Sequence, residues 1–403
     1  MKILVINTGS SSIKYQLFDM DEKQALVSGL AEKIGEETSI LTHKLNSANG
    51  DPRSKVENDR LADHGAGLAR IVELLTDSEY GVIKDKSEIS AVGHRVVHGG
   101  EAFKSSIVID DLVIGAIKEN IPLAPLHNPP NLTGIEVARN LFPDAPQVAV
   151  FDTAFHQSIP RRAYLYAVPY EMYLKNRVRR YGFHGTSHAY VAETAAEFLG
   201  RPLEELKLIT VHLGNGASMA AIKNGECIDT TMGLTPLEGL VMGTRSGDLD
   251  PALPFFLATN LNLSLKDVDR ILNKESGMKG LCGTNDMRDV EEKAAQGDER
   301  AKAALDVYAY RIKKYIGAYC AALGGLDAIL FTAGIGENSS LIRRMCCEEL
   351  GDIGITLDET KNRERRKDNR EISASDSRIK VLVIPTNEEK KIALETMRVL
   401  QNQ

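Results

Sequence analysis

The hydrophobic and polar positions at the start of the chain predict a β-hairpin. Residues 2–6 (KILVI) are almost wholly apolar, as expected of a buried strand. Small residues follow from Asn7 to Ser12, many of them with free hydroxyl groups. From Ile13 to Leu17 apolar and polar side chains alternate, which predicts a second strand.

The turn of this hairpin is typical of a phosphate site, because it combines Gly9 and three serines with one lysine, Lys14. It is not a Walker A loop, since its spacing is not GxxxxGK[ST] and no helical pattern follows. A phosphate held by a hairpin turn indicates another class of ATP-using fold.

The same pattern returns about 205 residues later. Residues 207–213 predict a strand, 214–218 a turn, and 219–222 the start of another strand. Two interpretations remain open: chance similarity of two hairpins, or an internal duplication that gives two lobes with one hairpin each.

Strand-like and helix-like patterns alternate elsewhere, which indicates an α/β fold. We expect strands at 89–97 and 147–151, and helices at 131–141, 187–199 (capped by Ser187) and 301–323. Residues 46–60 predict an exposed loop, and the charged run 361–370 a solvated surface. The apolar run 316–336 contains five glycines, so we expect a helix end and a buried strand at 328–331 there, and no membrane span.

Composition narrows the class of protein. The 403 residues allow two or three domains, and 43% hydrophobic and 26% charged residues are ordinary for a globular protein. A formal charge of −7 argues against nucleic acid or an anionic membrane as a partner. Five cysteines without a CxxC pair predict free thiols in the cytoplasm, and the first apolar run is too short for a signal peptide.

Several residues that could carry chemistry lie where loops leave apolar strands. They are Arg95, Asp152, His184 and Arg245. His184 and His188 are four residues apart, like a metal-binding pair, but Gly185 and Ser187 place a helix start between them, which argues against a HExxH zinc site. Residues 331–339 (FTAGIGENS) form a glycine-rich segment that suits either a nucleotide site or a plain tight turn.

Taken together, these features suit phosphoryl transfer. Phosphoryl transfer moves charge among oxygens and needs positive groups around them. The sequence offers two arginines, one histidine, one carboxylate and three glycine-rich turns for this reaction.

The motifs also resemble those of the acetokinase family of acetate kinases, within the acetate and sugar kinase, actin and heat-shock ATPase superfamily. The resemblance runs from NTGSSSIK to the segment 386–389, through GHRVVHGG, PLAPLHNPPN, VFDTAFHQ, RYGFHGTSH, HLGNGAS, TPLEGLVMGTRSGDLDP and FTAGIGEN. So many long motifs in the same order are far more specific than any one of them.

The resemblance implies two related actin-like, ribonuclease-H-like lobes with mixed sheets flanked by helices around a central cleft. The N-terminal lobe would comprise 1–150 and the helix 387–403. The C-terminal lobe, 151–386, would bind nucleotide and form a homodimer.

The resemblance also assigns roles to residues. Asp152, His184 and Arg245 match catalytic positions, and Asn7 and Glu388 match a magnesium site. Arg95 matches the residue that binds the substrate carboxylate, and Val97, Leu126, Phe183 and Pro236 match the acyl pocket. The nucleotide-binding positions are Lys14, His212, Leu213, Gly214, Asn215, Gly216, Asp286, Met287, Arg288, Gly334, Ile335, Gly336, Glu337 and Asn338.

The implied reaction is reversible, direct in-line transfer of the γ-phosphoryl group of ATP to acetate, giving acetyl phosphate and ADP. The implied cofactor is Mg²⁺, for which Mn²⁺ can substitute. One alternative is a propionate or butyrate kinase of the same family; Val97 leaves little room, which favours acetate. An alternative from another class is an actin-like or chaperone-like ATPase, which has no need of Arg95. We hypothesise that Asp152 orients Arg95, Arg245 or a magnesium-bound water. The basic run 389–391 is expected at the surface.

Overall fold

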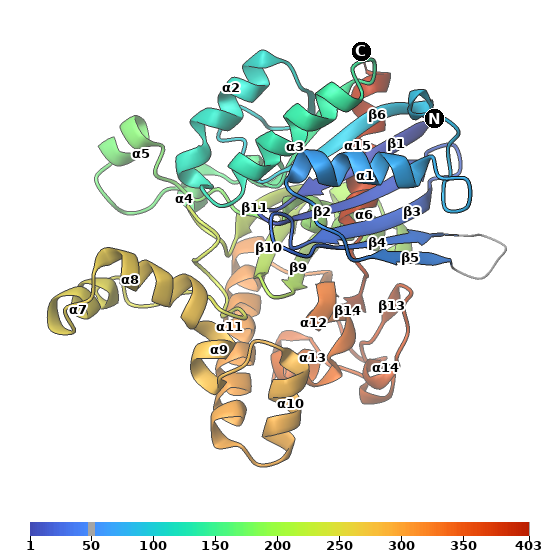
Figure 1. Cartoon of the computed structure of the whole chain (residues 1–403). Helices are drawn as coiled ribbons and strands as arrows, with labels where there is room; N and C mark the ends of the chain where they lie inside the picture. Colours follow the sequence, from blue (N-terminus) through green and yellow to red (C-terminus); the bar gives the residue numbers. More distant parts are fainter. Residues whose placement is uncertain (47–52, 403) are drawn as a thin grey trace. The chain divides into compact units, whose positions relative to one another are not determined.

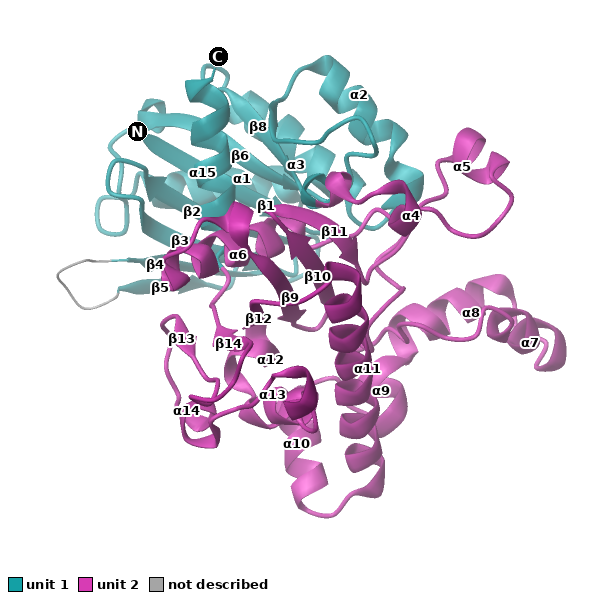
Figure 2. Ribbon diagram, turned by 180° about the vertical axis from the view of Figure 1, so that it is seen from behind, with its two compact units in different colours: residues 1–155, 387–403 teal, residues 156–386 magenta. Residues whose placement is uncertain are grey.

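The structure is a computed structural model that describes residues 1–46 and 53–402, and the chain divides into two compact units (Figure 2). Unit 1 comprises Met1–Phe155 and Asn387–Gln403, and unit 2 comprises His156–Thr386. The chain leaves unit 1 after Phe155 and returns to it at Asn387, so the C-terminal helix α15 (Glu388–Gln401) belongs to unit 1.

Unit 1 is built on a sheet with the strand order β5-β4-β3-β2-β1-β6-β8-β7 (Figure 1). Its strands are β1 Lys2–Thr8, β2 Ser12–Asp19, β3 Gln24–Glu32, β4 Ile40–Leu45, β5 Ser54–Glu57, β6 Ile89–Val96, β7 Ile107–Val108 and β8 Gln147–Phe151. Strand β1 is antiparallel to β2 and parallel to β6, which is parallel to β8. The helices, besides α15, are α1 His64–Leu75, α2 Asp111–Glu119 and α3 Asn128–Leu141.

Residues Ile3 to Ile6 of β1 are all apolar because helices cover both faces of the sheet there. Leu4 and Ile6 belong to a core that also contains residues of α1 and α3. Ile3 and Val5 belong to a second core, which contains Ile392 of α15. Side chains alternate between the two faces of a strand, so a strand with two covered faces must be hydrophobic at every position.

Unit 2 contains the second sheet, with the order β11-β10-β9-β12-β14-β13 (Figure 1). Its strands are β9 Lys207–Leu213, β10 Ala217–Lys223, β11 Glu226–Thr230, β12 Ala328–Thr332, β13 Arg370–Glu371 and β14 Lys380–Val383. The helices are α4 Arg161–Tyr164, α5 Glu171–Asn176, α6 Gly185–Leu199, α7 Leu253–Asn260, α8 Leu265–Arg270, α9 Gly277–Cys282, α10 Met287–Ala295, α11 Glu299–Leu323, α12 Ala333–Asn338, α13 Ser340–Cys347 and α14 Glu359–Arg363.

The two sheets share a five-strand pattern. The order β3-β2-β1-β6-β8 in unit 1 corresponds to β11-β10-β9-β12-β14 in unit 2, with the same parallel and antiparallel pairings. Helix α15 packs on the central strands of the unit 1 sheet, and helix α6 packs on those of the unit 2 sheet. Chance likeness of two hairpins would not reproduce this order, so the structure favours the internal duplication.

Most expected elements are confirmed, including the α/β class, the two hairpins and the strands β6 and β8. The loop expected at 46–60 is wrong at Ser54–Glu57, which form β5; residues 47–52 lie outside the described residues. Strand β5 is polar because it lies at the edge of its sheet and pairs only with β4. The expected cap is also wrong: α6 begins at Gly185, so Ser187 lies inside its first turn.

The long apolar run at 316–336 is divided as expected. Helix α11 ends at Leu323, Gly324 takes a left-handed conformation with φ 66°, and β12 follows from Ala328. Within residues 1–46 and 53–402, no helix combines the length and the apolar character needed to cross a membrane.

Candidate active site

In unit 1, two charged residues meet where neighbouring parallel strands end. Arg95 lies near the carboxyl end of β6, and Asp152 follows β8 directly. The guanidinium group of Arg95 donates from Nη2 to Asp152 Oδ2 at 2.5 Å and from Nε to Oδ1 at 3.3 Å. This two-point contact fixes one edge of the guanidinium plane.

The electrostatic surroundings keep Arg95 charged. Burial by itself lowers the pKa of Arg95, but the carboxylates of Asp152 and Glu388 outweigh this effect, so the net pKa is raised. The Asp152 side chain is almost fully buried. Among the described residues, the remaining nitrogen, Nη1, makes only a long contact of 3.4 Å to Asn7 Oδ1, so it is the part of Arg95 that is best placed to take a substrate oxygen.

Asn7 and Lys14 lie opposite each other in the β1–β2 pairing. Lys14 Nζ forms an ion pair with Glu389 Oε1 at 2.6 Å. The expectation that residues 389–391 lie at the surface is wrong for Glu389 and Lys391, which are both buried, because their helix α15 packs on the sheet. Sequence reasoning therefore missed Glu389, and its position next to Glu388 was the only signal.

Glu388, the first residue of α15, is an unusual carboxyl group. Its surroundings raise its pKa to about 7: burial, with the carboxylates of Asp152 and Glu389, raises the pKa more than Arg95 and Lys14 lower it. Five charged side chains of unit 1 therefore act on one another. Three are carboxyl groups (Asp152, Glu388 and Glu389) and two are cations (Lys14 and Arg95).

In unit 2, His184 stands immediately before helix α6, in a left-handed backbone conformation with φ 57°. Non-glycine residues adopt this conformation rarely, and it is often found at functional sites. The Nδ1 atom of His184 lies 2.9 Å from Ser218 Oγ of β10. The ring stacks on that of His212 of β9, with centroids 4.3 Å apart.

Arg245 is a half-buried arginine without a carboxylate partner among the residues that the structure describes. Its Nη1 atom donates to Pro236 O at 2.9 Å and lies 3.4 Å from Met242 Sδ. Burial lowers its pKa. The backbone around it is held firmly, because Met242 N donates to Arg245 O and Met278 N donates to Met242 O.

Gly216 lies next to both His184 and Arg245. A side-chain carbon added at Gly216 would lie 3.5 Å from His184 Nε2 and 3.6 Å from Arg245 Nη1. The point above Gly216 is therefore flanked by an imidazole and a guanidinium group. Such a point can accept an anionic oxygen, because two donors face it and no Cβ fills it.

The predicted nucleotide turns are linked within unit 2. Asn285 Nδ2 donates to Asn215 Oδ1 at 3.1 Å, which joins the turn 214–216 to the segment that begins α10. Asp286 caps α10 and pairs with the exposed Arg288 at 2.6 Å, while Met287 is buried. The third segment is not a plain turn, because residues Gly334 to Asn338 lie in the short helix α12.

Helix α12 is held at its C-terminal half. Arg343, a fully buried arginine, donates from Nη1 to Gly336 O at 2.9 Å and to Glu337 O at 3.0 Å. Glu337 Oε1 accepts a hydrogen bond from Thr386 N. Gly336 lies near Val211 O of β9, and Val211 immediately precedes His212. This proximity would allow Ile335 and its neighbours to act together with the turn after β9.

The four residues predicted to form the acyl pocket divide between the units. Val97 and Leu126 lie in unit 1; Val97 is buried and its backbone N–H donates to Asn131 Oδ1, whereas the Leu126 side chain is 65% exposed. Phe183 and Pro236 lie in unit 2, where Phe183 is buried and Pro236 is half-buried. Leu213 is buried at the end of β9.

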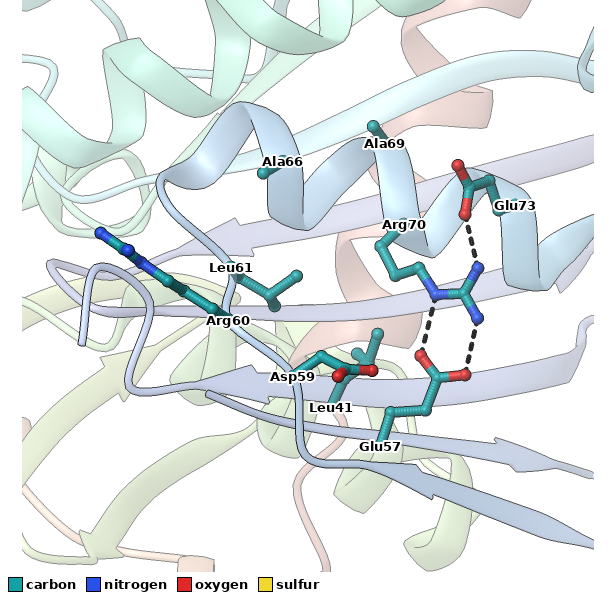
Figure 3. A pocket seen from close by; sticks show the side chains of 9 residues that line it. All are labelled: Leu41, Glu57, Asp59, Arg60, Leu61, Ala66, Ala69, Arg70 and Glu73. Carbon is teal, nitrogen blue, oxygen red and sulfur yellow. Dashed lines mark hydrogen bonds and ion pairs between the residues drawn. The ribbon is translucent and has the colours of Figure 1, made fainter. Parts of the chain in front are cut away.

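A cavity of about 260 Å³ lies away from these residues, between β5, β4 and α1 of unit 1 (Figure 3). Figure 3 shows Arg70 of α1 reaching Glu57 of β5 and Glu73. Because these charges neutralise one another and no predicted site residue lines the cavity, it is not a candidate for the catalytic centre.

Comparison with known proteins gives one consistent result. The model of the acetokinase family matches residues 2–394. An acetate kinase from Thermotoga petrophila is 58% identical over 404 residues, covering 100% of this chain and 99% of the relative.

Solved structures agree. The crystal structure of Porphyromonas gingivalis acetate kinase has a TM-score of 0.93 at 47% identity, and covers 99% of both chains. A propionate kinase from Francisella tularensis subsp. tularensis has a TM-score of 0.92 at 42% identity, also over 99% of both chains.

Proposed function

Because the chain belongs to the acetokinase family, we propose that it transfers the γ-phosphoryl group of ATP to acetate, reversibly, giving acetyl phosphate and ADP. One observation carries the proposal: Arg245, a cation without a carboxylate partner in the described residues, shares the open point above Gly216 with His184. A phosphoryl oxygen would supply the missing negative charge.

The acceptor needs no activation by a base. Acetate is ionised at pH 7, so catalysis reduces to placing its carboxylate in line with the phosphoryl group and stabilising the charge that develops. In this mechanism Arg95 holds the carboxylate through Nη1, and Arg245 and His184 donate to the equatorial phosphoryl oxygens.

Asp152 acts, in this proposal, by orienting Arg95. The two-point contact between them supports this choice over Arg245 or a bound water, because it leaves only one edge of the guanidinium group for substrate. The carboxylate therefore has a role that involves no proton transfer.

Asn7 and Glu388 would hold Mg²⁺. The described residues contain no group of three or more His, Cys, Asp or Glu side chains placed to hold a metal ion. An incomplete site of this kind suits Mg²⁺, which binds through one or two protein oxygens and keeps waters and substrate phosphates as its other ligands. A divalent cation would also favour the ionised form of Glu388, whose pKa burial raises. When bound, Mg²⁺ neutralises charge on the β- and γ-phosphates.

We assign nucleotide binding mainly to the C-terminal lobe, 151–386, through the three linked segments at 212–216, 286–288 and 334–338. Lys14, held by Glu389 in the N-terminal lobe, would reach the nucleotide phosphates. The N-terminal lobe, 1–150 with 387–403, would supply the acetate-binding arginine and the metal ligands.

Acetate is the favoured acyl acceptor over propionate. A propionate kinase is among the similar structures, and one methylene group in an apolar pocket changes binding by only about 1–3 kcal/mol. Val97 is buried, and a side chain of its size at the acyl pocket would limit the room for a longer chain.

Formation of acetyl hydroxamate from ATP, acetate and hydroxylamine tests the proposal. We expect product with acetate, less with propionate and least with butyrate. ATP hydrolysis without any hydroxamate would instead support the ATPase alternative and overturn the kinase assignment. A higher kcat/KM with propionate than with acetate would overturn only the acyl preference.

A second copy of the chain would be its macromolecular partner. In unit 2, helices α7 and α8 form an arm that extends from the rest of the unit (Figure 2). The arm exposes Phe255 at 70%, Phe256 at 53% and Leu265 at 77%. Exposed apolar residues grouped in this way are typical of protein interfaces. We expect a dimer by light scattering, and a monomer for Phe255→Asp/Phe256→Asp. A wild-type monomer at micromolar concentration would contradict the dimer.

The compartment is proposed as the cytoplasm. All five cysteines are free thiols in the structure, which suits a reducing environment.

A further inference from the structure

A chain of hydrogen bonds runs from His184 into the interior of unit 2. His184 Nδ1 lies 2.9 Å from Ser218 Oγ, which lies 2.8 Å from His188 Nε2. His188 Nδ1 lies 2.7 Å from Thr210 Oγ1, which in turn is 3.4 Å from Ala220 O. The His184–His188 spacing that could suggest a metal pair is therefore bridged by one hydroxyl group.

The three residues behind His184 are fully buried. Ser218 and Thr210 lie on the neighbouring strands β10 and β9, and His188 lies one helical turn after His184 on α6. Burial, with His156 and His212 nearby, lowers the pKa of His188 well below its usual value, so its ring is neutral and carries one proton. A neutral ring donates from one nitrogen and accepts at the other.

The protons of this chain can be arranged in two senses. In the first, Thr210 donates to His188 Nδ1, His188 Nε2–H donates to Ser218, and Ser218 donates to His184 Nδ1. A neutral His184 then carries its proton on Nε2. In the second, every donor is reversed, Thr210 donates to Ala220 O, and His184 donates from Nδ1 to Ser218.

An anionic oxygen at the point above Gly216 favours the first sense. The Thr210–His188 contact of 2.7 Å is a hydrogen bond in either sense, and the Thr210 contact to Ala220 O, at 3.4 Å, adds only a weak bond to the second. Only the first sense leaves a neutral His184 with its proton on Nε2, the ring nitrogen that faces the point above Gly216.

We propose that Ser218, backed by His188 and Thr210, positions His184 so that its Nε2 atom donates to the phosphoryl group in both the neutral and the cationic state of the ring. The proposal rests on the function proposed above. Ser218, His188 and Thr210 are positioning residues, since they act through His184. Their contribution is a fixed ring orientation and a fixed proton position.

The geometry on the other side of the ring agrees with this role. His184 Nε2 is the polar atom of the ring that faces the point above Gly216, where Arg245 Nη1 also lies. The titratable or charged groups around His184 include His212 of β9, His188 of α6 and Arg245 of the loop after β11. A cationic His184 would add to the charge of Arg245, so a neutral ring that still donates from Nε2 is useful at this site.

Removal of the Ser218 hydroxyl gives a result that depends on pH. In Ser218→Ala the neutral ring loses its donor at Nδ1 and can turn over, whereas a cationic ring presents an N–H whichever way it turns. We expect kcat to fall about 10- to 100-fold near pH 8, with a smaller loss near pH 6 and an ATP KM within about twofold of the wild-type value. Thr210→Val should give a weaker effect in the same direction.

Two variants separate positioning from simple loss of packing. Ser218→Thr keeps the hydroxyl and should recover most of kcat and the wild-type pH profile. Ser373→Ala removes another fully buried serine hydroxyl of unit 2, which donates to Glu371, and should leave the profile unchanged.

A Ser218→Ala enzyme with wild-type kcat across the pH range would overturn the proposal, as would an equal loss at every pH. If Ser218→Ala does not fold, ¹⁵N spectra of the nine histidines of the wild type remain decisive. They should show neutral His184 protonated on Nε2, and protonation on Nδ1 would overturn the proposal. Failure of the proposed function is distinguishable, because the wild type would then form no acetyl hydroxamate at any pH.

Discussion

The two hairpins of the molecule share a backbone and differ in what they carry. One residue pair before each turn, β1 and β2 place Asn7 opposite Lys14, and β9 and β10 place His212 opposite Ser218. Around the first pair lie Arg95, Asp152 and two glutamates. Around the second lie histidines, hydroxyl groups and one arginine.

This difference concerns how charge is balanced. In the unit 1 cluster, Arg95 and Lys14 each have a carboxylate partner, so the cluster is held together without a ligand. In unit 2 Arg245 lacks a carboxylate partner within the described residues, and uncharged groups hold the nearby imidazole. Duplicated strands can therefore supply one site that is preorganised by ion pairs and another that lacks an anion.

The largest effect should come from Arg245→Leu. We expect kcat to fall about 10³-fold, because a donor to the transferring group is lost, with a much smaller change in the ATP KM. Stability should not fall, since an unpaired, partly buried cation is removed. Steady-state kinetics and urea unfolding check both points. An equal rise in ATP KM with unchanged kcat would mean that Arg245 only binds nucleotide.

Asp152→Asn should disrupt the ion-paired cluster of unit 1. Without its carboxylate, Arg95 is left without its main ion-pair partner, so we expect kcat/KM for acetate to fall about 10²-fold and the unfolding free energy to fall by roughly 3 kcal/mol. Asp111→Asn is the matched control, because the pair of Asp111 with Arg139 is exposed. Near-normal turnover of Asp152→Asn would show that the carboxylate is dispensable.

Gly216→Ala should fill the open point between His184 and Arg245 in unit 2. The added carbon would make ordinary contacts at 3.4–3.6 Å with His184 and Arg245, so folding should be unaffected. A phosphoryl oxygen would be displaced, and we expect kcat to fall about 10- to 100-fold. As a control, Gly115→Ala in α2 meets no neighbouring atom and should stabilise the protein by up to about 1 kcal/mol. Full activity of Gly216→Ala would place the phosphoryl group elsewhere.

The smallest effect concerns an ion pair outside both clusters. Arg70 lowers the pKa of Glu57 from 4.5 to about 2, so the pair stabilises the fold above pH 4.5 and this contribution is lost as the pH falls towards 2. Glu57→Gln should lower the unfolding free energy by about 1 kcal/mol at pH 7, and the difference from wild type should shrink by pH 3. Urea unfolding at both pH values measures it, and a constant difference would contradict the assignment.

The sequence predicted the elements whose pattern is local. The apolar runs of β1 and β9, the break at Gly324 and the α/β class could all be predicted, because strand and helix periodicities are written in neighbouring residues. Strand β5 was missed because an edge strand is polar and reads like a loop. The partners of Glu389 and His188 were missed because nothing local distinguishes a buried charged or polar residue from an exposed one.

The sequence by itself therefore determined the family, the hairpins and the identity of the chemical groups. Tertiary structure alone decided which of them touch. Strand register placed Ser218 between His184 and His188, the parallel ends of β6 and β8 joined Arg95 to Asp152, and α15 brought Glu389 to Lys14. These contacts join residues far apart in the chain, so they follow from sheet order and helix packing rather than from any local pattern.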